Sequence, residues 1–182
     1  DILLSGCGVI ILSPLYLILA IAIKIDDPGP IFFRQKRVGL HKTHFQILKF
    51  RTMKSDTPHD KPTHLLEHPE QYITRVGKVL RKTSLDELPQ LLNILTGSLH
   101  IVSYRPSLYN QTDLIRERDR CGLHQLRPGL TGWAQINGYR GDTSIRKRIE
   151  YDIYYIENWS MSFDFKIMFL TIFKGFINEN AY

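Results

Sequence analysis

Cysteine is scarce in this chain. The 182 residues include only Cys7 and Cys121, and the two do not form the close pairs typical of metal-binding or redox motifs. Cys7 also lies within an apolar run. The sequence therefore gives no support to a disulfide framework or a cysteine metal centre, and we expect a protein of a reducing compartment.

Charge is absent from the first segment. Residues 2–23 contain no Asp, Glu, Lys or Arg, and every Lys and Arg lies after them. Internal repeats and low-complexity tracts are also lacking, so nothing indicates a repeat architecture. The length corresponds to one domain that can bury a core. Because the chain begins at Asp1 and not at methionine, we expect a further segment upstream.

The charge that is present is mostly positive. A net charge of +6 and a pI near 9.3 suit anionic partners, namely a membrane surface, nucleotide phosphates or a nucleic acid. Composition does not choose among them. The hypothesis of a nucleic-acid-binding protein has little support, because it rests on charge alone and no recognition motif accompanies that charge.

The apolar segment is long enough to cross a bilayer, since its residues would extend roughly 33 Å as a straight helix. It lacks the basic start and the cleavage site of a signal peptide. Ser13–Pro14 interrupts it, because proline removes a backbone hydrogen bond. A kinked spanning helix and a re-entrant hairpin both remain open. Basic residues follow it and indicate the cytoplasmic face and anionic lipid: Arg34, Lys36 and Arg37.

Periodicity predicts the elements that follow. Residues 45–53 are expected to form a strand with Lys49 and Arg51 on one face. Amphipathic or charged helices are predicted at 72–81 and 109–120, the latter exposed, and a turn with a short strand at 96–106. Residues 162–177 are apolar but interrupted by charge, which favours an interfacial helix over a spanning one, with core packing as the alternative.

Two segments have unusual compositions. Residues 55–72 contain three histidines among prolines; their spacing does not match a metal site on one helix face, and an irregular loop is the simpler interpretation: His59, His64 and His68. Residues 127–141 (RPGLTGWAQINGYRG) are rich in glycine, which predicts a loop whose backbone can approach a ligand. This loop carries polar and stacking side chains: Arg127, Trp133, Gln135 and Asn137.

The stretch TSLDELPQLLN, residues 83–93, places Asp86 and Glu87 at the start of a predicted helix. Cationic side chains precede it and an apolar helical pattern follows. Ser84 and Glu87 fit a capping box, but Pro89 would then be the fifth helical residue and would lose a backbone hydrogen bond. Asp86 as N-cap avoids that cost. Spacing alone therefore favours a structural role for the two acids over a catalytic one.

Longer motifs change that balance. Ser13–Pro14, KFRTM at 49–53, LRKTSLDELPQLLNIL at 80–95, RPGLTGWAQINGYRG and DIYYIENWS at 152–160 resemble the bacterial sugar transferases. These are small monotopic phosphoglycosyl transferases that initiate surface glycan synthesis on polyprenyl phosphate. The resemblance covers nearly the whole chain.

The resemblance implies an α/β (α+β) fold, mostly helical with a short sheet. Residues 1–25 would form a re-entrant membrane helix broken at Ser13 and Pro14. Residues 26–182 would form a membrane-associated catalytic domain with C-terminal interfacial helices, on the cytoplasmic face of a bacterial inner membrane. The implied partners are a UDP-sugar, polyprenyl phosphate and membrane lipid, with no nucleic acid; a homodimer is a further hypothesis.

The resemblance also implies a mechanism. Asp86 and Glu87 match the family's catalytic pair, in which the aspartate attacks the β-phosphorus of a UDP-sugar, releases UMP and passes the phosphosugar to polyprenyl phosphate. Mg²⁺ would be held by Asp86 and Glu87. The expected phosphate- and substrate-binding residues are Lys49, Arg51, Arg81, Arg105, Arg127, Gln135 and Asn137.

One segment departs from the family pattern. Where members usually read GDMS, then a short apolar pair and GPRP, this chain reads GSLHIVSYRP at 97–106. Ser98 replaces an aspartate, and Ser103–Tyr104 replace Gly-Pro. The departure supports a second hypothesis, a catalytically degenerate member that acts as a membrane scaffold in a glycan assembly complex.

Overall fold

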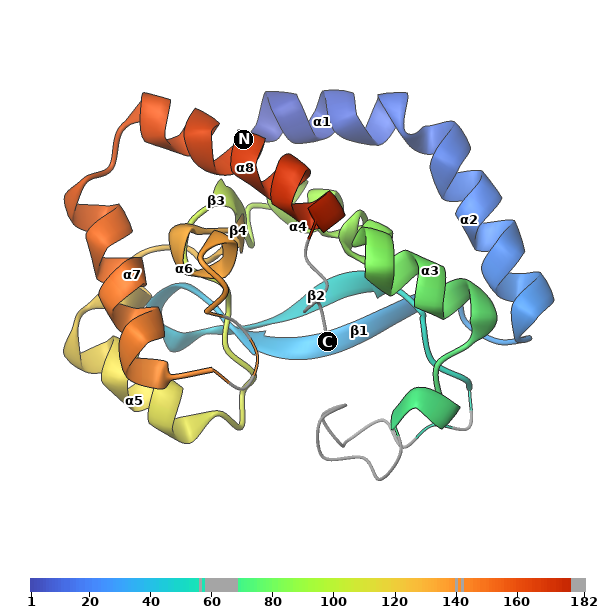
Figure 1. Cartoon of the computed structure of the whole chain (residues 1–182), viewed down its shortest axis with the longest axis horizontal. Coiled ribbons are helices and arrows are strands. Elements are labelled where there is room, and N and C mark those ends of the chain that lie inside the picture. Colours follow the sequence, from blue (N-terminus) through green and yellow to red (C-terminus); the bar gives the residue numbers. More distant parts are fainter. Residues whose placement is uncertain (56, 58–68, 140, 142, 178–182) are drawn as a thin grey trace.

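Helices surround two separate two-stranded sheets in the computed structural model of the chain (Figure 1). The structure describes residues 1–55, 57, 69–139, 141 and 143–177. The prediction of a mostly helical α/β fold with a short sheet is confirmed. The histidines considered as metal ligands, His59, His64 and His68, lie outside the described residues.

Strands β1 (Phe32–Val38) and β2 (His44–Phe50) form an antiparallel hairpin. Its register runs from Phe32 opposite Phe50 to Val38 opposite His44. The strand predicted at 45–53 is correct in its centre, but it ends at Phe50. Beyond Phe50 the chain no longer pairs with β1, and Met53 forms only an isolated bridge with Ile73.

The apolar N-terminal segment forms two helices, α1 (Ile2–Ile11) and α2 (Ser13–Asp26), which meet at a bend of 60°. The Ser13 hydroxyl donates to the Ile10 carbonyl at 2.8 Å. Pro14 lies in the first turn of α2, where its missing N–H costs no helical hydrogen bond. Among the described helices, none is by itself long and apolar enough to cross a bilayer, whereas this bent pair meets both criteria together.

Both arms of this bent pair pack on the stretch that carries the two acids. Helix α1 lies on α4 (Gln90–Leu95), where a Cβ added to Gly8 would come within 3.2 Å of the Leu91 side chain. From α2, Ile23 lies in a buried cluster against which Leu88 packs, and the Tyr16 hydroxyl donates to the Leu88 carbonyl at 2.6 Å. The apolar segment is therefore part of the tertiary fold.

The helix predicted to begin at Ser84 or Asp86 does not form, and both capping predictions are wrong. Helix α3 (Arg75–Thr83) ends at Ser84, which takes a left-handed conformation with φ 58°. A 3₁₀ turn (Leu85–Glu87) follows, and α4 starts only after Pro89. Because proline has no N–H, it suits the beginning of α4 but would interrupt a helix that started earlier.

Asn93 of α4 fixes this stretch to the hairpin. Its Oδ1 accepts a hydrogen bond from the Leu48 backbone N–H at 2.9 Å, and its Nδ2 donates to the Gln46 carbonyl at 2.8 Å. The side-chain amide thus replaces a neighbouring strand along the edge of β2 and sets the height of the 3₁₀ turn above the sheet.

The glycine-rich segment is more ordered than predicted. It contains β4 (Gly129–Thr131), which pairs parallel with β3 (His100–Val102), and the short helix α6 (Trp133–Ile136). A Cβ on Gly129 or Gly132 would lie 2.3 Å or 2.0 Å from the Ser103 backbone. The loop prediction is wrong here because these two glycines permit close backbone packing.

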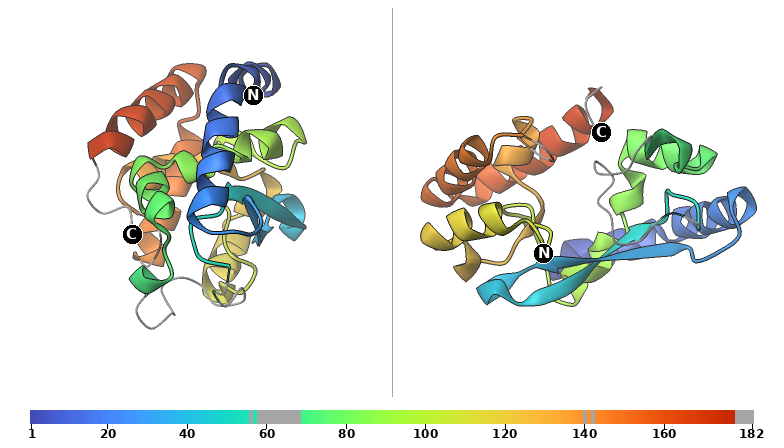
Figure 2. Two further views of the ribbon diagram at one scale, coloured as in Figure 1. Left: turned by 90° about the vertical axis from the view of Figure 1, so that its right-hand side faces the viewer. Right: turned by 90° about the horizontal axis from the view of Figure 1, so that it is seen from below.

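The remaining helices are α5 (Thr112–Arg120), α7 (Ile145–Glu157) and α8 (Met161–Ile177). The prediction that α5 is exposed is wrong for its inner side, because Leu114 and Arg118 are buried. Figures 1 and 2 both place α1 and α8 on the side of the molecule opposite α5.

Exposed apolar side chains are concentrated on α1, α2 and α8 among the described residues. Helix α8 buries Ile167 completely, so the predicted core packing is present on one of its faces. Large apolar side chains are exposed on α1, α2 and α8, among them Ile10, Ile11, Leu17, Ile18, Phe165, Phe169 and Phe173. An interfacial position for α8 is consistent with this surface and stays a prediction.

Candidate active site

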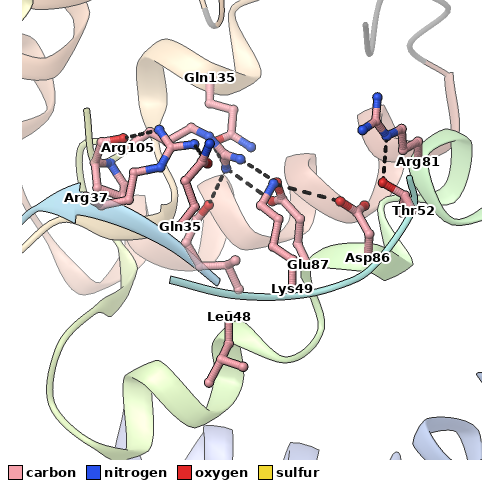
Figure 3. Close-up of polar contacts among 12 residues, drawn as sticks. Gln35, Arg37, Leu48, Lys49, Thr52, Arg81, Asp86, Glu87, Arg105 and Gln135 are labelled. Carbon is pink, nitrogen blue, oxygen red and sulfur yellow. Dashed lines mark hydrogen bonds and ion pairs between the residues drawn. The ribbon is translucent and has the colours of Figure 1, made fainter. Parts of the chain in front are cut away.

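Asp86 and Glu87 lie in the 3₁₀ turn directly above β2, and Asp86 is 9% exposed. Lys49 projects from β2 between them. Its Nζ is 2.7 Å from Glu87 Oε1 and 3.8 Å from Asp86 Oδ2 (Figure 3). The longer separation leaves Asp86 less tightly held than its neighbour.

Arg105 completes the surroundings of Glu87. Its Nη2 donates to Glu87 Oε1, and its Nη1 lies 3.1 Å from Oε2, so the guanidinium grips both carboxylate oxygens. Nη1 is also 3.3 Å from the Leu130 carbonyl and from Gln135 Oε1. The predicted residues Lys49, Arg105 and Gln135 are therefore brought together with the acid pair.

The two adjacent carboxyls have opposite electrostatic environments. Burial alone would raise the pKa of Glu87, but Arg105 and Lys49 outweigh it and hold that pKa well below its ordinary value. Burial raises the pKa of Asp86, and the Glu87 charge adds to this effect against the opposing charges of Lys49, Arg81 and Arg105. Glu87 is a firmly ionised anchor, whereas Asp86 is the less stabilised anion.

Arg81 approaches from the other side of Asp86. Its Nε donates to Thr52 Oγ1 at 2.9 Å (Figure 3). Its charge lowers the pKa of Asp86, which places a third cation within electrostatic reach of that carboxylate.

Arg51 has a different environment from the one predicted. Its guanidinium donates to the Asp27 carboxylate and to the Asp27 carbonyl. Ser55 Oγ donates to the same carboxylate at 2.7 Å. Arg51 therefore joins the end of β2 to the exit of α2, and the structure does not place it at the acid pair.

Arg127 and Asn137, two other predicted binding residues, make no contact with the acid pair among the interactions of the described residues. Arg127 is exposed and lines a pocket of about 580 Å³ together with His100 and Trp159. Asn137 donates from Nδ2 to the Trp133 carbonyl at 2.8 Å and so closes the end of α6. Ser13 and Pro14 lie at the bend between α1 and α2.

Arg37 is a site residue that the sequence analysis missed. Its Nη1 donates to the Pro106 carbonyl at 3.1 Å and its Nη2 to Gln35 Oε1 at 2.6 Å. Burial and the charge of Arg105 lower the pKa of Arg37 to about 9. Strand alternation could have found it, because β1 places Gln35 and Arg37 on the same face as Lys49 of β2.

The donor set fits a magnesium ion that is bound mostly through its substrate. No group of three or more His, Cys, Asp or Glu side chains able to hold a metal occurs among the described residues. Mg²⁺ usually takes one or two carboxylates plus phosphate oxygens and waters. Asp86 and Glu87 could supply those carboxylates.

The site thus places two adjacent carboxylates among lysine and arginine side chains. Glu87 is held firmly by its cations, whereas Asp86 is held only loosely. A carboxylate can act as a nucleophile at phosphorus when cations neutralise the phosphate charge and align it. The arrangement suits group transfer at a diphosphate.

Comparison with known proteins identifies the family. The family model described as bacterial sugar transferase matches residues 1–178. The chain belongs to this family. As a bacterial sugar transferase, it is 43% identical over its whole length to the UDP-glucose:undecaprenyl-phosphate glucose-1-phosphate transferase of Escherichia coli, of which it covers 40%. The Caulobacter vibrioides protein of the same name is 41% identical over the whole chain, with 70% of that protein covered.

Other relatives differ in the sugar that their names carry. The UDP-N-acetylgalactosamine-undecaprenyl-phosphate N-acetylgalactosaminephosphotransferase of Aeromonas hydrophila is 39% identical over 94% of this sugar transferase, which covers 41% of that protein. The chain thus spans about two fifths of the length of the E. coli and Aeromonas relatives.

Proposed function

We propose that this chain is the catalytic part of a phosphoglycosyl transferase that moves a sugar 1-phosphate from a UDP-sugar to undecaprenyl phosphate. The convergence of Lys49, Arg81 and Arg105 on the pair Asp86–Glu87 carries the proposal. The names of the E. coli and Caulobacter relatives support the reaction class.

In the first step, an Asp86 carboxylate oxygen attacks the β-phosphorus of the UDP-sugar. A bond forms between that oxygen and phosphorus, and the bond from phosphorus to the bridging oxygen breaks. UMP leaves with the bridging oxygen and the electron pair. In the second step, an oxygen of undecaprenyl phosphate attacks the same phosphorus, and the Asp86 carboxylate is released unchanged.

The other residues prepare this chemistry. Glu87, gripped by Arg105 and Lys49, keeps both cations at a fixed position beside the nucleophile. Lys49 contacts both acids, and Arg81 flanks Asp86 from the opposite side. A diphosphate entering here meets cations on two sides, which favours charge neutralisation and alignment.

Magnesium would be held by Asp86 and Glu87 together with oxygens of the diphosphate. When bound, the ion supplies additional positive charge against the developing charge of the leaving UMP.

The proposed acceptor and the exposed apolar surface both support a membrane location. Undecaprenyl phosphate is a lipid, and the exposed apolar side chains of α1, α2 and α8 suit contact with a bilayer. We propose that the bent α1–α2 pair enters one leaflet and returns, with the catalytic residues at the cytoplasmic face of the inner membrane. Both substrates then reach the acids from the same side.

Release of UMP tests the reaction. Protein reconstituted in lipid vesicles with undecaprenyl phosphate and Mg²⁺ is given a panel of UDP-sugars that includes UDP-glucose and UDP-N-acetylgalactosamine. We expect UMP and a lipid-linked sugar from at least one donor, and a loss of about a thousandfold in Asp86→Asn. Equal UMP release by wild type and Asp86→Asn would reject Asp86 as the nucleophile.

The alternative, a degenerate scaffold, rests on Ser98 and Ser103–Tyr104. Tyr104 is 2% exposed, and its hydroxyl donates to the Leu126 carbonyl at 3.0 Å, so the bulky residue is packed without displacing Arg105 from Glu87. This favours the enzyme. Robust turnover with any donor of the panel would eliminate the scaffold hypothesis.

A further inference from the structure

Behind the acid pair lies a buried ion pair that the chemistry above does not use. Arg118 of α5 is 1% exposed, and its Nη2 is 2.7 Å from Oδ2 of Asp152 on α7, whose side chain is 2% exposed. The same guanidinium donates from Nη1 to the backbone carbonyl of Arg105 at 2.7 Å. It therefore links two helices to the main chain of the residue that grips Glu87.

Tyr104 fixes the plane of this guanidinium. The Arg118 Cζ lies 4.8 Å from the centre of the Tyr104 ring, within the range of a cation–π contact. The segment is held on its other side by Gly129 and Gly132, whose backbones lie against Ser103. The chain around Arg105 is thus fixed from both sides.

Stability alone does not explain this arrangement. A buried ion pair costs much desolvation energy, and a well-packed apolar pair of similar volume often serves the fold as well or better. An apolar pair cannot donate a directed hydrogen bond to the Arg105 carbonyl. That contact is the feature for which an arginine is needed.

We propose that Arg118, oriented by Asp152 and Tyr104, is a positioning residue that sets the place of Arg105 and thereby the grip on Glu87 beside the nucleophile. The proposal rests on the proposed function for its kinetic consequence. Its structural consequence, the protection of Arg105 by Glu87, holds whatever the substrate.

The test replaces the ion pair by apolar residues in the double variant Arg118→Met/Asp152→Leu. The matched control is Lys42→Gln/Asp119→Asn, which removes an exposed ion pair between Asp119 of α5 and Lys42 of the turn after β1, with 2.9 Å between Lys42 Nζ and Asp119 Oδ2. We expect the double variant to fold with a moderately lower Tm, because the Arg105 carbonyl loses its donor, and to lose about tenfold or more in kcat with KM within about threefold. The control keeps wild-type kinetics.

A second readout needs no turnover. Phenylglyoxal labelling of Arg105, followed by mass spectrometry, reports whether its guanidinium is held by Glu87. We expect labelling to be about threefold or more faster in the double variant than in wild type and control, with the exposed Arg120 as internal reference.

The outcomes separate the two proposals. A folded double variant with wild-type kcat, or with wild-type labelling of Arg105, overturns the positioning role. If the double variant does not fold, the single variant Asp152→Asn is labelled instead, and unchanged labelling overturns the role equally. A wild-type protein that releases no UMP while the labelling difference persists refutes the proposed function and leaves the positioning role supported.

Discussion

At the scale of single residues, the adjacent acids Asp86 and Glu87 differ in how strongly the folded protein stabilises their ionised forms. The desolvation cost of the Glu87 charge is offset by two cations in direct contact, Arg105 and Lys49. Asp86 is buried with a single longer ion pair to Lys49 at 3.8 Å. The residue proposed as nucleophile is thus the one whose ionised form is the less stabilised of the two.

Asp86→Asn should raise stability at neutral pH. Burial places the pKa of Asp86 above its ordinary value of 3.8, so the folded state loses stability as the pH rises from 3.8 and carries the full cost of the charge above the raised pKa. The variant removes this cost. Thermal melts should show a higher Tm than wild type at pH 8, with the gap closing as the pH falls through the raised pKa of Asp86 toward 3.8. A lower Tm at pH 8 would contradict this expectation.

Glu87→Gln should have the opposite effect. Arg105 and Lys49 hold the pKa of Glu87 below its ordinary 4.5, so its contribution to stability is present above that value and is lost as pH falls through the lowered pKa. Removing the carboxylate leaves two cations without their partner. We expect a loss of about 3 kcal/mol at pH 7 in urea unfolding; stability equal to that of Asp86→Asn would show that the two sites are electrostatically alike.

At the scale of elements, the exit of α2 is fastened to both β2 and α3. Asp27 receives Arg51 from the end of β2, and Asp26 Oδ2 accepts from the Val76 N–H at 2.7 Å in the first turn of α3. The apolar helices are therefore held to the elements that carry Lys49 and Arg81. The orientation of this segment and the geometry of the acid pair depend on the same contacts.

Arg51→Gln tests whether Arg51 serves this junction or the substrate. The side chain is buried against Asp27, so we expect a lower free energy of unfolding, by about 1–3 kcal/mol, and a KM for the UDP-sugar within about twofold of wild type. Arg34→Gln, at an exposed position of β1, is the control. A raised KM with unchanged stability would show that Arg51 binds the substrate.

At the scale of the whole molecule, the exposed apolar side chains of α1, α2 and α8 belong to helices that also pack on the catalytic core. Ile23 and Ile167 are buried in that core, whereas Leu17 and Phe165 are exposed. Each helix thus has an inner face that packs in the fold and an outer face that exposes apolar side chains. If the proposed membrane attachment is correct, the helices that make it are the same ones that shape the site.

Cysteine labelling decides the path of α1–α2. In a Cys7→Ser/Cys121→Ser background, single cysteines replace Asp1 or Lys36, which are exposed on either side of the bent pair. An impermeant maleimide should label both from the cytoplasmic side of inverted membrane vesicles, as a re-entrant hairpin requires. Labelling of the two positions from opposite sides would establish a kinked spanning segment instead.

The sequence by itself was sufficient for the features that are local in the chain. The break at Ser13–Pro14, the centre of β2 and the general helical content follow from proline stereochemistry and from hydrophobic periodicity. The family was recognisable because its motifs are contiguous. The structure brings Lys49 and Arg105, both selected from the sequence, into ion pairs with Glu87, and their role at the site stays a prediction.

Only the tertiary structure decided which cations meet the acids. Arg51 and Lys49 are two residues apart in the chain, yet Arg51 binds Asp27 while Lys49 binds Glu87. Arg37 joined the site and Arg127 did not. The physical reason is that the position of a basic residue in the sequence does not determine which acid it will meet. The partner of a long basic side chain depends on which segments the core brings beside it, and those segments are distant in the chain.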